Sequence, residues 1–215
     1  GGGGGGLVLI VVVAVLLLCC CRRGGAAVAP LTTASRMAAP PRCEWAAAPS
    51  AKEGSHSSRT KEGSARDTKR YCCFLSHYKV EAGSDARYLN DLIARMTGVP
   101  CFLDSSDLSD LRTLMSEGVQ QSDVLVVLGT KGVLTRPWCL LELWEAHTQG
   151  VPIIFVTVEG RGFDFGDAKH FASHFKEELE AANPGALELV EKGLRQQGAT
   201  VDDLAAALAL LLDAA

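Results

Sequence analysis

The run SDVLVVLG, residues 122–129, constrains the fold of this chain more than any other segment. Val124 to Leu128 are five consecutive aliphatic residues, so this segment has no polar side to turn toward water. Such continuity is typical of a strand that is buried on both faces of a parallel sheet. We therefore expect helices on both sides of that sheet.

Strand-like and helix-like segments alternate around this run. Further short apolar runs predict strands at residues 71–77, 99–104 and 151–158. Amphipathic stretches lie between them, at residues 84–98, at 106–121 and in the segment that follows Pro137. The order β-α-β-α-β-α-β predicts an α/β fold with a parallel sheet and helices on both of its faces.

Apolar stripes at helical spacing support the first two helices. In residues 84–98 the stripe comprises Leu89, Leu92, Ile93 and Met96, and Gly98 marks a stop. In residues 106–121 it comprises Leu108, Leu111, Leu114 and Met115.

The C-terminal part predicts more helices. Residues 167–182 and 186–198 read as helices on either side of a break at Asn183-Pro184-Gly185. Thr200 with Asp203 predicts an N-terminal cap for a last, leucine-rich helix.

Two segments of different composition precede the folded part. Residues 1–23 are glycine followed by hydrocarbon side chains, and residues 24–70 form a linker without apolar periodicity. From Arg22 to Arg70 the chain has ten Lys and Arg against four Asp and Glu; since the whole chain carries −4, residues 71–215 carry −10. An acidic folded part argues against nucleic acid as a partner, because phosphate binding needs a basic face. The basic linker could lie against an anionic membrane surface.

The fifteen apolar residues 7–21 have three interpretations. In a single membrane span, Arg22 and Arg23 directly after the run would leave the rest of the chain in the cytoplasm, and the cysteines 19–21 would suit S-palmitoylation. The run is shorter than the roughly 20 residues of a typical span. A signal peptide fits less well, because its basic residues would precede the apolar run. The third interpretation is an incomplete or misassigned sequence, since six glycines open the chain.

The eight cysteines form no CxxC pair and no zinc-ligand spacing, so the sequence predicts no metal site. Cys72, Cys73 and Cys101 fall inside predicted strands, where a free thiol behaves as a small buried hydrophobe. We infer a reducing compartment, and the even number of cysteines leaves disulfides as the alternative. His170 and His174 stand four residues apart with Asp167 one turn earlier, but no further ligand set is evident.

Ligands of open α/β sheets bind beyond the carboxyl ends of the strands. The phosphate-binding motifs GxGxxG and GxxxxGK[ST] are absent there, and so is the Gly-x-Ser-x-Gly motif of hydrolases. The residues that follow the predicted strands are instead Ser76-His77-Tyr78-Lys79, Asp104-Ser105-Ser106, Gly129-Thr130-Lys131 and Val158-Glu159-Gly160.

Several of these segments together resemble Toll/interleukin-1 receptor (TIR) domains. CCFLSHYK resembles the family's opening strand and loop, and GVPCFLD is similar to its second strand. SDVLVVLGTKGVLTRPWCLLEL resembles the third strand and the start of the Trp-Cys-x-x-Glu-Leu helix, which is the most specific part of the match. The resemblance covers residues 71–160 in order and spacing. The residues in these segments especially resemble those of a TIR-like group in unicellular eukaryotes.

The resemblance implies a flavodoxin-like parallel sheet of four to five strands. Residues 71–160 would be the TIR core, and residues 161–215 would be a C-terminal helical part of the same domain. It also implies signal transduction through association with other TIR domains, as a homo-oligomer. Two departures stand out. The loop after Asp104 lacks the glycine- or proline-containing stretch of many signalling TIR domains, and Thr135 stands where the pattern has serine nearby.

The helix after Pro137 carries the residue that the resemblance singles out. At 3.6 residues per turn, one face of this helix is expected to hold Trp138, Glu142, Glu145 and Gln149. The opposite side, with Leu140, Leu143, Trp144 and His147, is expected to pack on the sheet. The polar face is either an ordinary solvated surface or part of a ligand site.

In NAD-cleaving TIR domains the glutamate of Trp-x-x-x-Glu is catalytic, and the resemblance maps it onto Glu142. Cleavage of the nicotinamide–ribose bond builds positive charge on the sugar, which a fixed carboxylate would stabilise. NAD+ would be a substrate, and no cofactor is implied.

Other substrate contacts are expected from the same sheet edge. Trp138 and Tyr78 could stack on a base, and the phosphates would need cations such as Lys79, Lys131 and Arg136. His77 could act as a general base, and Asp104 could bind substrate. Each has an ordinary alternative, as a loop residue, a solvated charge or, for Asp104, a helix cap. Two functions remain: a self-associating NAD+ hydrolase and a non-catalytic TIR scaffold.

Overall fold

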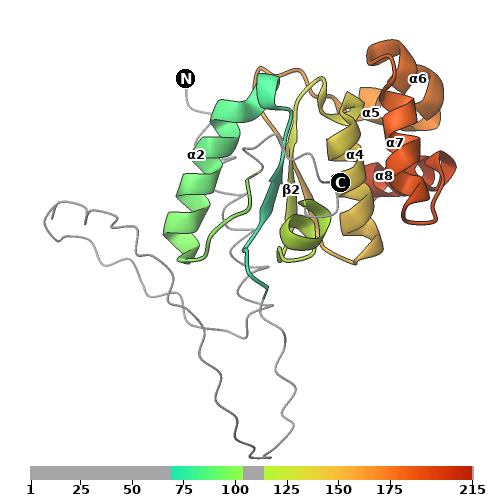
Figure 1. Cartoon of the computed structure of the whole chain (residues 1–215). Helices are drawn as coiled ribbons and strands as arrows, with labels where there is room; N and C mark the ends of the chain where they lie inside the picture. Colours follow the sequence, from blue (N-terminus) through green and yellow to red (C-terminus); the bar gives the residue numbers. More distant parts are fainter. Residues whose placement is uncertain (1–68, 104–113, 215) are drawn as a thin grey trace, which may run out of the picture.

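A three-stranded parallel sheet forms the centre of the computed structural model, which describes residues 69–103 and 114–214 (Figure 1). Its strands are β1 (Phe74–Ser76), β2 (Leu125–Gly129) and β3 (Ile153–Thr157), in the order β1-β2-β3. Both pairs of neighbours are parallel. The predicted parallel α/β architecture is therefore confirmed.

The predicted membrane anchor and basic linker lie outside the described residues. Among the residues that the structure does describe, no helix has the length and apolar character needed to cross a membrane.

Helices cover both faces of the sheet. Figure 1 shows α2 (Lys79–Thr97) on one face and α4 (Pro137–Thr148) on the other. Beyond α4 stand the C-terminal helices, which are α5 (Phe165–Ser173), α6 (Phe175–Ala182), α7 (Ala186–Arg195) and α8 (Val201–Ala214). Two short turns complete the described elements, the π-helix η1 (Leu114–Val119) and the 3-10 helix η2 (Val133–Thr135).

Alternate side chains of β2 fill two separate cores. Val126 and Leu128 pack with residues of α2, such as Ile93. Leu125 and Val127 belong to the other core, which includes residues of α4, α7 and α8. All four of these strand residues are inaccessible to solvent. The unbroken aliphatic run is thus explained by a strand whose two faces are both covered.

The second predicted strand, residues 99–104, is shorter than expected. In the described part it forms one isolated parallel bridge, between Phe102 and Phe74. The backbone N–H of Leu75 donates to the Phe102 carbonyl at 3.0 Å, and the N–H of Phe102 donates to the Cys73 carbonyl at 2.7 Å. The described residues thus hold three strands where four to five were expected.

Three predicted helices differ from the observed ones. Helix α2 begins at Lys79 and not near residue 84. A first helical piece precedes the predicted one and joins it across a kink at Ala82, where φ is −133°. The predicted helix 167–182 is divided into α5 and α6 at His174, whose ψ of 35° is not helical. The described end of the predicted helix 106–121 is the π-helix η1, and Leu108 and Leu111 lie outside the described residues.

The structure confirms the two helix ends at which the sequence predicts a stop or a cap. Gly98 ends α2 in the left-handed conformation (φ 67°) and donates its N–H to the Ala94 carbonyl. Before α8, the N–H of Asp203 donates to Thr200 Oγ1, and the N–H of Thr200 donates to Asp203 Oδ2 at 2.9 Å. These reciprocal bonds satisfy backbone donors that the first helical turn leaves open.

Gly118 in η1 leaves room for two stacked aromatic rings, those of Phe74 and Phe102. The rings of Phe74 and Phe102 are 5.1 Å apart between centroids and 12° from parallel. A Cβ atom at position 118 would lie 2.7 Å from Cε2 of Phe74 and 3.1 Å from Cε1 of Phe102. The ring of Phe74 is fully buried, so it has little room to move.

We expect Gly118→Ala to lower the free energy of unfolding by about 1–3 kcal/mol, because the added methyl group overpacks the two rings. Gly83→Ala is the matched control: a Cβ there meets nothing within 4 Å, and alanine is favoured over glycine in a helix by about 0.5–1 kcal/mol. Urea unfolding of the two variants measures both effects. Equal stability of the two variants would contradict the described packing of η1.

Candidate functional site at the carboxyl edge of the sheet

Ser76 and Glu142 meet where β1 ends. The hydroxyl of Ser76 donates to Oε2 of Glu142 at 2.5 Å, and the two residues are 1% and 4% exposed. Glu142 lies in the second turn of α4, which begins at Pro137, a residue suited to the first helical position. The carboxylate is therefore held against the sheet edge, and a fully solvated polar face is the wrong interpretation of this helix.

Glu145, one turn further along α4, is also buried. It is 4% exposed, and its Oε1 accepts a hydrogen bond from Gln120 Nε2 at 2.7 Å. His147, expected to face the sheet, is exposed, whereas Leu140 and Leu143 are buried as expected. The physical reason is that Glu142 and Glu145 lie on the side of α4 that faces the end of β1 and the segment after η1, while Leu141 on another side packs against Gly193 of α7.

The Cys139 thiol lies close to Ser76 and Glu142. It donates to the His77 carbonyl at 3.6 Å. Burial raises its pKa, and the neighbouring Glu142 carboxylate raises that pKa further, while a hydrogen bond with Ser76 and the charge of Arg136 act in the opposite direction. Cys139 is thus a neutral thiol, which makes it a poor nucleophile.

A cavity of about 560 Å³ lies at the carboxyl edge of the sheet and is lined by residues that follow each of the three strands. Tyr78 follows β1, Lys131 follows β2 and Phe163 follows β3. The guanidinium of Arg136 lies 4.2 Å from the centroid of the Tyr78 ring, a cation–π contact. Arg136 also donates to Thr135 Oγ1 at 3.0 Å. The volume is in the range of small-molecule sites, about 300–1,000 Å³.

The opposite wall of the cavity comes from α5 and α6 and from the turn before them. Its polar lining residues are Asp164, Asp167, His170 and Glu178. Lys131 and Arg136 on one wall therefore face mainly acidic groups on the other, and the first wall also carries the carboxylate of Glu81, which accepts a hydrogen bond from the N–H of Gly132 at 2.9 Å. This arrangement suits a ligand that has both anionic groups and hydrogen-bond donors.

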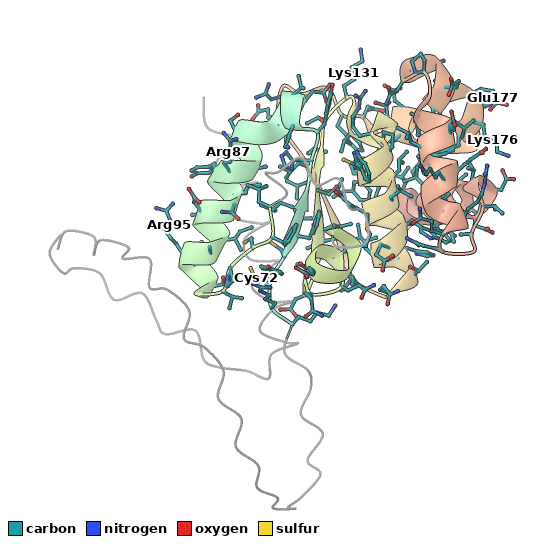
Figure 2. All side chains as sticks on the ribbon, viewed as in Figure 1. Cys72, Arg87, Arg95, Lys131, Lys176 and Glu177 are labelled. Atoms are coloured by element: carbon teal, nitrogen blue, oxygen red, sulfur yellow. The ribbon has the colours of Figure 1, made fainter. Side chains whose placement is uncertain are left out.

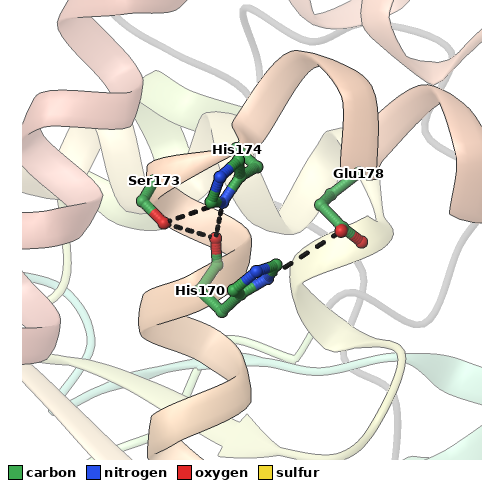
Figure 3. Close-up of polar contacts among 4 residues, drawn as sticks. All are labelled: His170, Ser173, His174 and Glu178. Atoms are coloured by element: carbon green, nitrogen blue, oxygen red, sulfur yellow. Dashed lines mark hydrogen bonds and ion pairs between the residues drawn. The ribbon is translucent and has the colours of Figure 1, made fainter.

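His170 of α5 and His174, which follows the last residue of that helix, stack on one another (Figure 3). Their ring centroids are 4.4 Å apart. Nδ1 of His174 is 3.0 Å from Ser173 Oγ and 3.2 Å from the His170 carbonyl oxygen, while Nδ1 of His170 is 3.8 Å from Glu178 Oε1 (Figure 3). The two histidine side chains thus have different partners, and His170 and Glu178 both line the cavity.

The structure brings together some of the predicted site residues and separates others. Tyr78, Lys131 and Arg136 line the cavity, and Lys131 stands at the carboxyl edge of the sheet in Figure 2. Glu142 is not among the residues that line this cavity, and neither is its partner Ser76.

The remaining predicted residues have other surroundings. Trp138 is 44% exposed, and Lys79 is exposed as the first residue of α2. Nδ1 of His77 lies 3.1 Å from the Leu75 carbonyl oxygen. Asp104 lies outside the described residues.

Sequence reasoning missed Ser76 as a partner of Glu142, and it missed the acidic wall. Ser76 could have been found, since it is the last residue of a strand whose carboxyl end faces α4. The wall could not, because nothing in the pattern indicates how α5 and α6 pack.

We expect Ser76→Ala to lower the free energy of unfolding by about 1–3 kcal/mol, because it removes a hydrogen bond to a buried carboxylate. Ser84→Ala, at an exposed position of α2, is the matched control and should change stability by no more than about 0.5 kcal/mol. Chemical denaturation measures both. Equal effects of the two substitutions would show that the Ser76 hydroxyl does not support Glu142.

No protein-family model matches this chain, and no curated protein matches it either. The geometry and chemistry of the carboxyl edge are therefore the grounds for a functional proposal.

Proposed function

We propose that this chain is a TIR-like signalling protein that self-associates and hydrolyses the nicotinamide–ribose bond of NAD+, with Glu142 as the catalytic carboxylate. The observation that carries the proposal is the buried contact between Ser76 and Glu142 at the carboxyl edge of the sheet. The proposal includes the cytoplasmic side of a membrane as the place of action, with residues 7–21 as the anchor.

The strand order supports a flavodoxin-like sheet. The segment around Phe102 bonds to the edge of β1 that β2 leaves open, so the order across the sheet is this segment, β1, β2 and β3. Numbered along the chain, that order is 2-1-3-4, which is how flavodoxin-like sheets begin. The order reverses between β1 and β2, and such a switch point is where doubly wound sheets bind ligands.

The proposed reaction needs a fixed negative charge at this switch point. When the bond between the ribose and nicotinamide breaks, both bonding electrons leave with the nicotinamide nitrogen, and the sugar becomes an oxocarbenium-like cation. The carboxylate of Glu142 would stabilise that cation. Water then adds its oxygen to the anomeric carbon and releases one proton, which gives nicotinamide and ADP-ribose.

The neighbouring cavity supplies the remaining contacts. Lys131 and Arg136 would hold the pyrophosphate, and the ring of Tyr78 offers a face on which a base can stack. The carboxylates of Asp164 and Asp167 on the opposite wall can accept hydrogen bonds from ribose hydroxyls or an exocyclic amine.

Access to Glu142 is the step that self-association would have to provide. At 4% exposure the carboxylate cannot touch a sugar unless the end of β1 moves and Ser76 releases it. We therefore propose that the isolated chain is poorly active and that association between copies opens the site.

The non-catalytic scaffold is the second candidate, and one observation favours it. Trp138 in the first turn of α4 is 44% exposed, although tryptophan is rarely left open to water. Exposed aromatic side chains are frequent anchors of protein interfaces. A scaffold would use this surface and would not need Glu142.

We expect Glu142→Gln to lower the rate of nicotinamide release from NAD+ by at least about 100-fold at high protein concentration, because glutamine accepts the Ser76 hydrogen bond but carries no charge. Glu145→Gln is the matched control: it is the same substitution at an equally buried position of the same helix, and it should leave most of the activity. Absence of release from the unsubstituted chain, measured in its associated form, would leave the scaffold as the remaining candidate.

We expect Arg136→Gln to raise the KM for NAD+ by about 10-fold and to change kcat little, because a phosphate contact is made equally in the ground state and the transition state. Arg195→Gln, which changes an exposed arginine on α7, is the control. Steady-state kinetics separates the two constants. An unchanged KM would remove Arg136 from the substrate site.

A further inference from the structure

Three thiols gather at the end of the sheet opposite to the cavity. Cys72 and Cys73 directly precede β1, and Cys101 lies in the segment bonded to the edge of that strand. Their sulfur atoms all lie within 4.8 Å of one another, and the sulfurs of Cys72 and Cys101 are 3.5 Å apart. Figure 2 shows Cys72 at the opposite end of the molecule from Lys131.

A local bend in the backbone creates this cluster. Consecutive residues of a regular strand point to opposite faces, yet Cys72 and Cys73 both belong to the core on the α2 side. The chain bends at Cys72, before β1 begins, and so turns both thiols to one side. The N–H of Cys72 donates to the Pro100 carbonyl at 3.0 Å, which fixes the segment that carries Cys101 beside them.

The cluster packs in the core on the α2 side, but polar atoms also contact it: the Thr97 hydroxyl donates to the Cys72 sulfur at 3.8 Å, and the thiols of Cys72 and Cys101 donate to the carbonyls of Val99 and Asn90. One of the three thiols is accessible. Cys72 and Cys73 are inaccessible, whereas Cys101 is partly exposed and offers a route of entry. A hydrogen bond with Cys72 is the main cause that raises the pKa of Cys101 to about 12, and similar bonds raise that of Cys73. Cys73 and Cys101 are therefore neutral thiols in the structure described.

The donor set is purely sulfur. Among the described residues, no histidine or carboxylate joins the three cysteines within ligand distance. Thiolates favour soft cations such as Cu(I) and Zn(II). Structural zinc sites almost always have four protein ligands, and this cluster offers three.

We propose that Cys72, Cys73 and Cys101 form a binding site for one soft metal ion, and that this site prefers Cu(I) to Zn(II). Metal–sulfur bonds of about 2.3 Å place the sulfurs of one ion roughly 4 Å apart, so small side-chain rotations would suffice. Each cysteine that binds as thiolate releases one proton, and no electron is transferred. The ion would join the start of β1 to its neighbouring segment.

The test uses the full chain with Cys19, Cys20, Cys21 and Cys43 replaced by serine, because these four thiols could also bind copper. Under anaerobic conditions, this background chain is titrated with Cu(I) in competition with a chromophoric Cu(I) chelator. We expect one ion per chain, thiolate-to-copper absorption in the ultraviolet, and a higher Tm, since an ion that binds the folded state stabilises it. Zn(II) bound in the same protein should be displaced by Cu(I).

Two variants of this background chain identify the ligands. Cys101→Ser should weaken Cu(I) binding by more than about 100-fold, since loss of a supporting outer group alone costs about 10- to 100-fold. Cys139→Ala, which removes a buried thiol on α4 far from the cluster, should leave the affinity unchanged. Equal affinities in these two variants would overturn the assignment.

X-ray absorption at the copper edge keeps the test decisive even if Cys101→Ser fails to fold. The background chain should show two or three sulfur neighbours at about 2.3 Å from the copper. Nitrogen or oxygen neighbours in their place would overturn the proposal. So would a reduced chain that binds no Cu(I), or one from which Cu(I) fails to displace Zn(II).

Discussion

Burial of β2 on both of its faces is the constraint on which the rest of the structure depends. Each fully buried Val or Leu contributes about 1.5–3 kcal/mol relative to an exposed one, so exposing either face of this strand would be costly. Val126 and Leu128 require α2, and Leu125 and Val127 require α4. Both helices follow a strand after a short connection, so the candidate site lies at the carboxyl ends of the strands, with Glu142 in the second turn of α4 and a wall from α5 and α6.

Packing of α4 against the end of β1 and the segment after η1 buries two glutamates of this helix. Glu142 and Glu145 are both 4% exposed, while α7 and α8 share a core with the apolar residues of α4. A buried carboxylate is costly unless it is hydrogen-bonded. Glu142 meets this requirement with Ser76, and Glu145 meets it with Gln120. Two glutamates on one helix thus have separate partners, so the effect of replacing Glu142 can be compared with that of replacing Glu145.

The local signals in the sequence predicted the local features well. The aliphatic run of β2, the left-handed glycine at position 98 and the reciprocal cap of Thr200 and Asp203 follow from a few neighbouring residues, and the structure has each of them. Features that depend on distant contacts were missed. Helical periodicity placed Glu142 and Glu145 on a polar face, but it contained no information about Ser76 and Gln120, against which that face packs.

The same distinction explains the candidate sites. Tyr78, Lys131 and Arg136 could be predicted to converge because parallel strands end at one edge. The acidic wall depends on the turn of the chain at His174, which helical periodicity does not reveal. The cysteine cluster was also missed, because alternation along a regular strand would have pointed Cys72 and Cys73 to opposite faces, and the bend at Cys72 cancels that alternation.

The shortness of β1 gives its register an unusual importance. The strand has three residues. Cys72 and Cys73 directly precede it, and Ser76 is its last residue. Because side chains alternate, a slip of one residue against β2 would exchange the two faces of the strand. Phe74 would then leave the core on the α4 side, and the Ser76 hydroxyl would turn away from Glu142. The alignment of one very short strand therefore decides whether both ends of the sheet keep their chemistry.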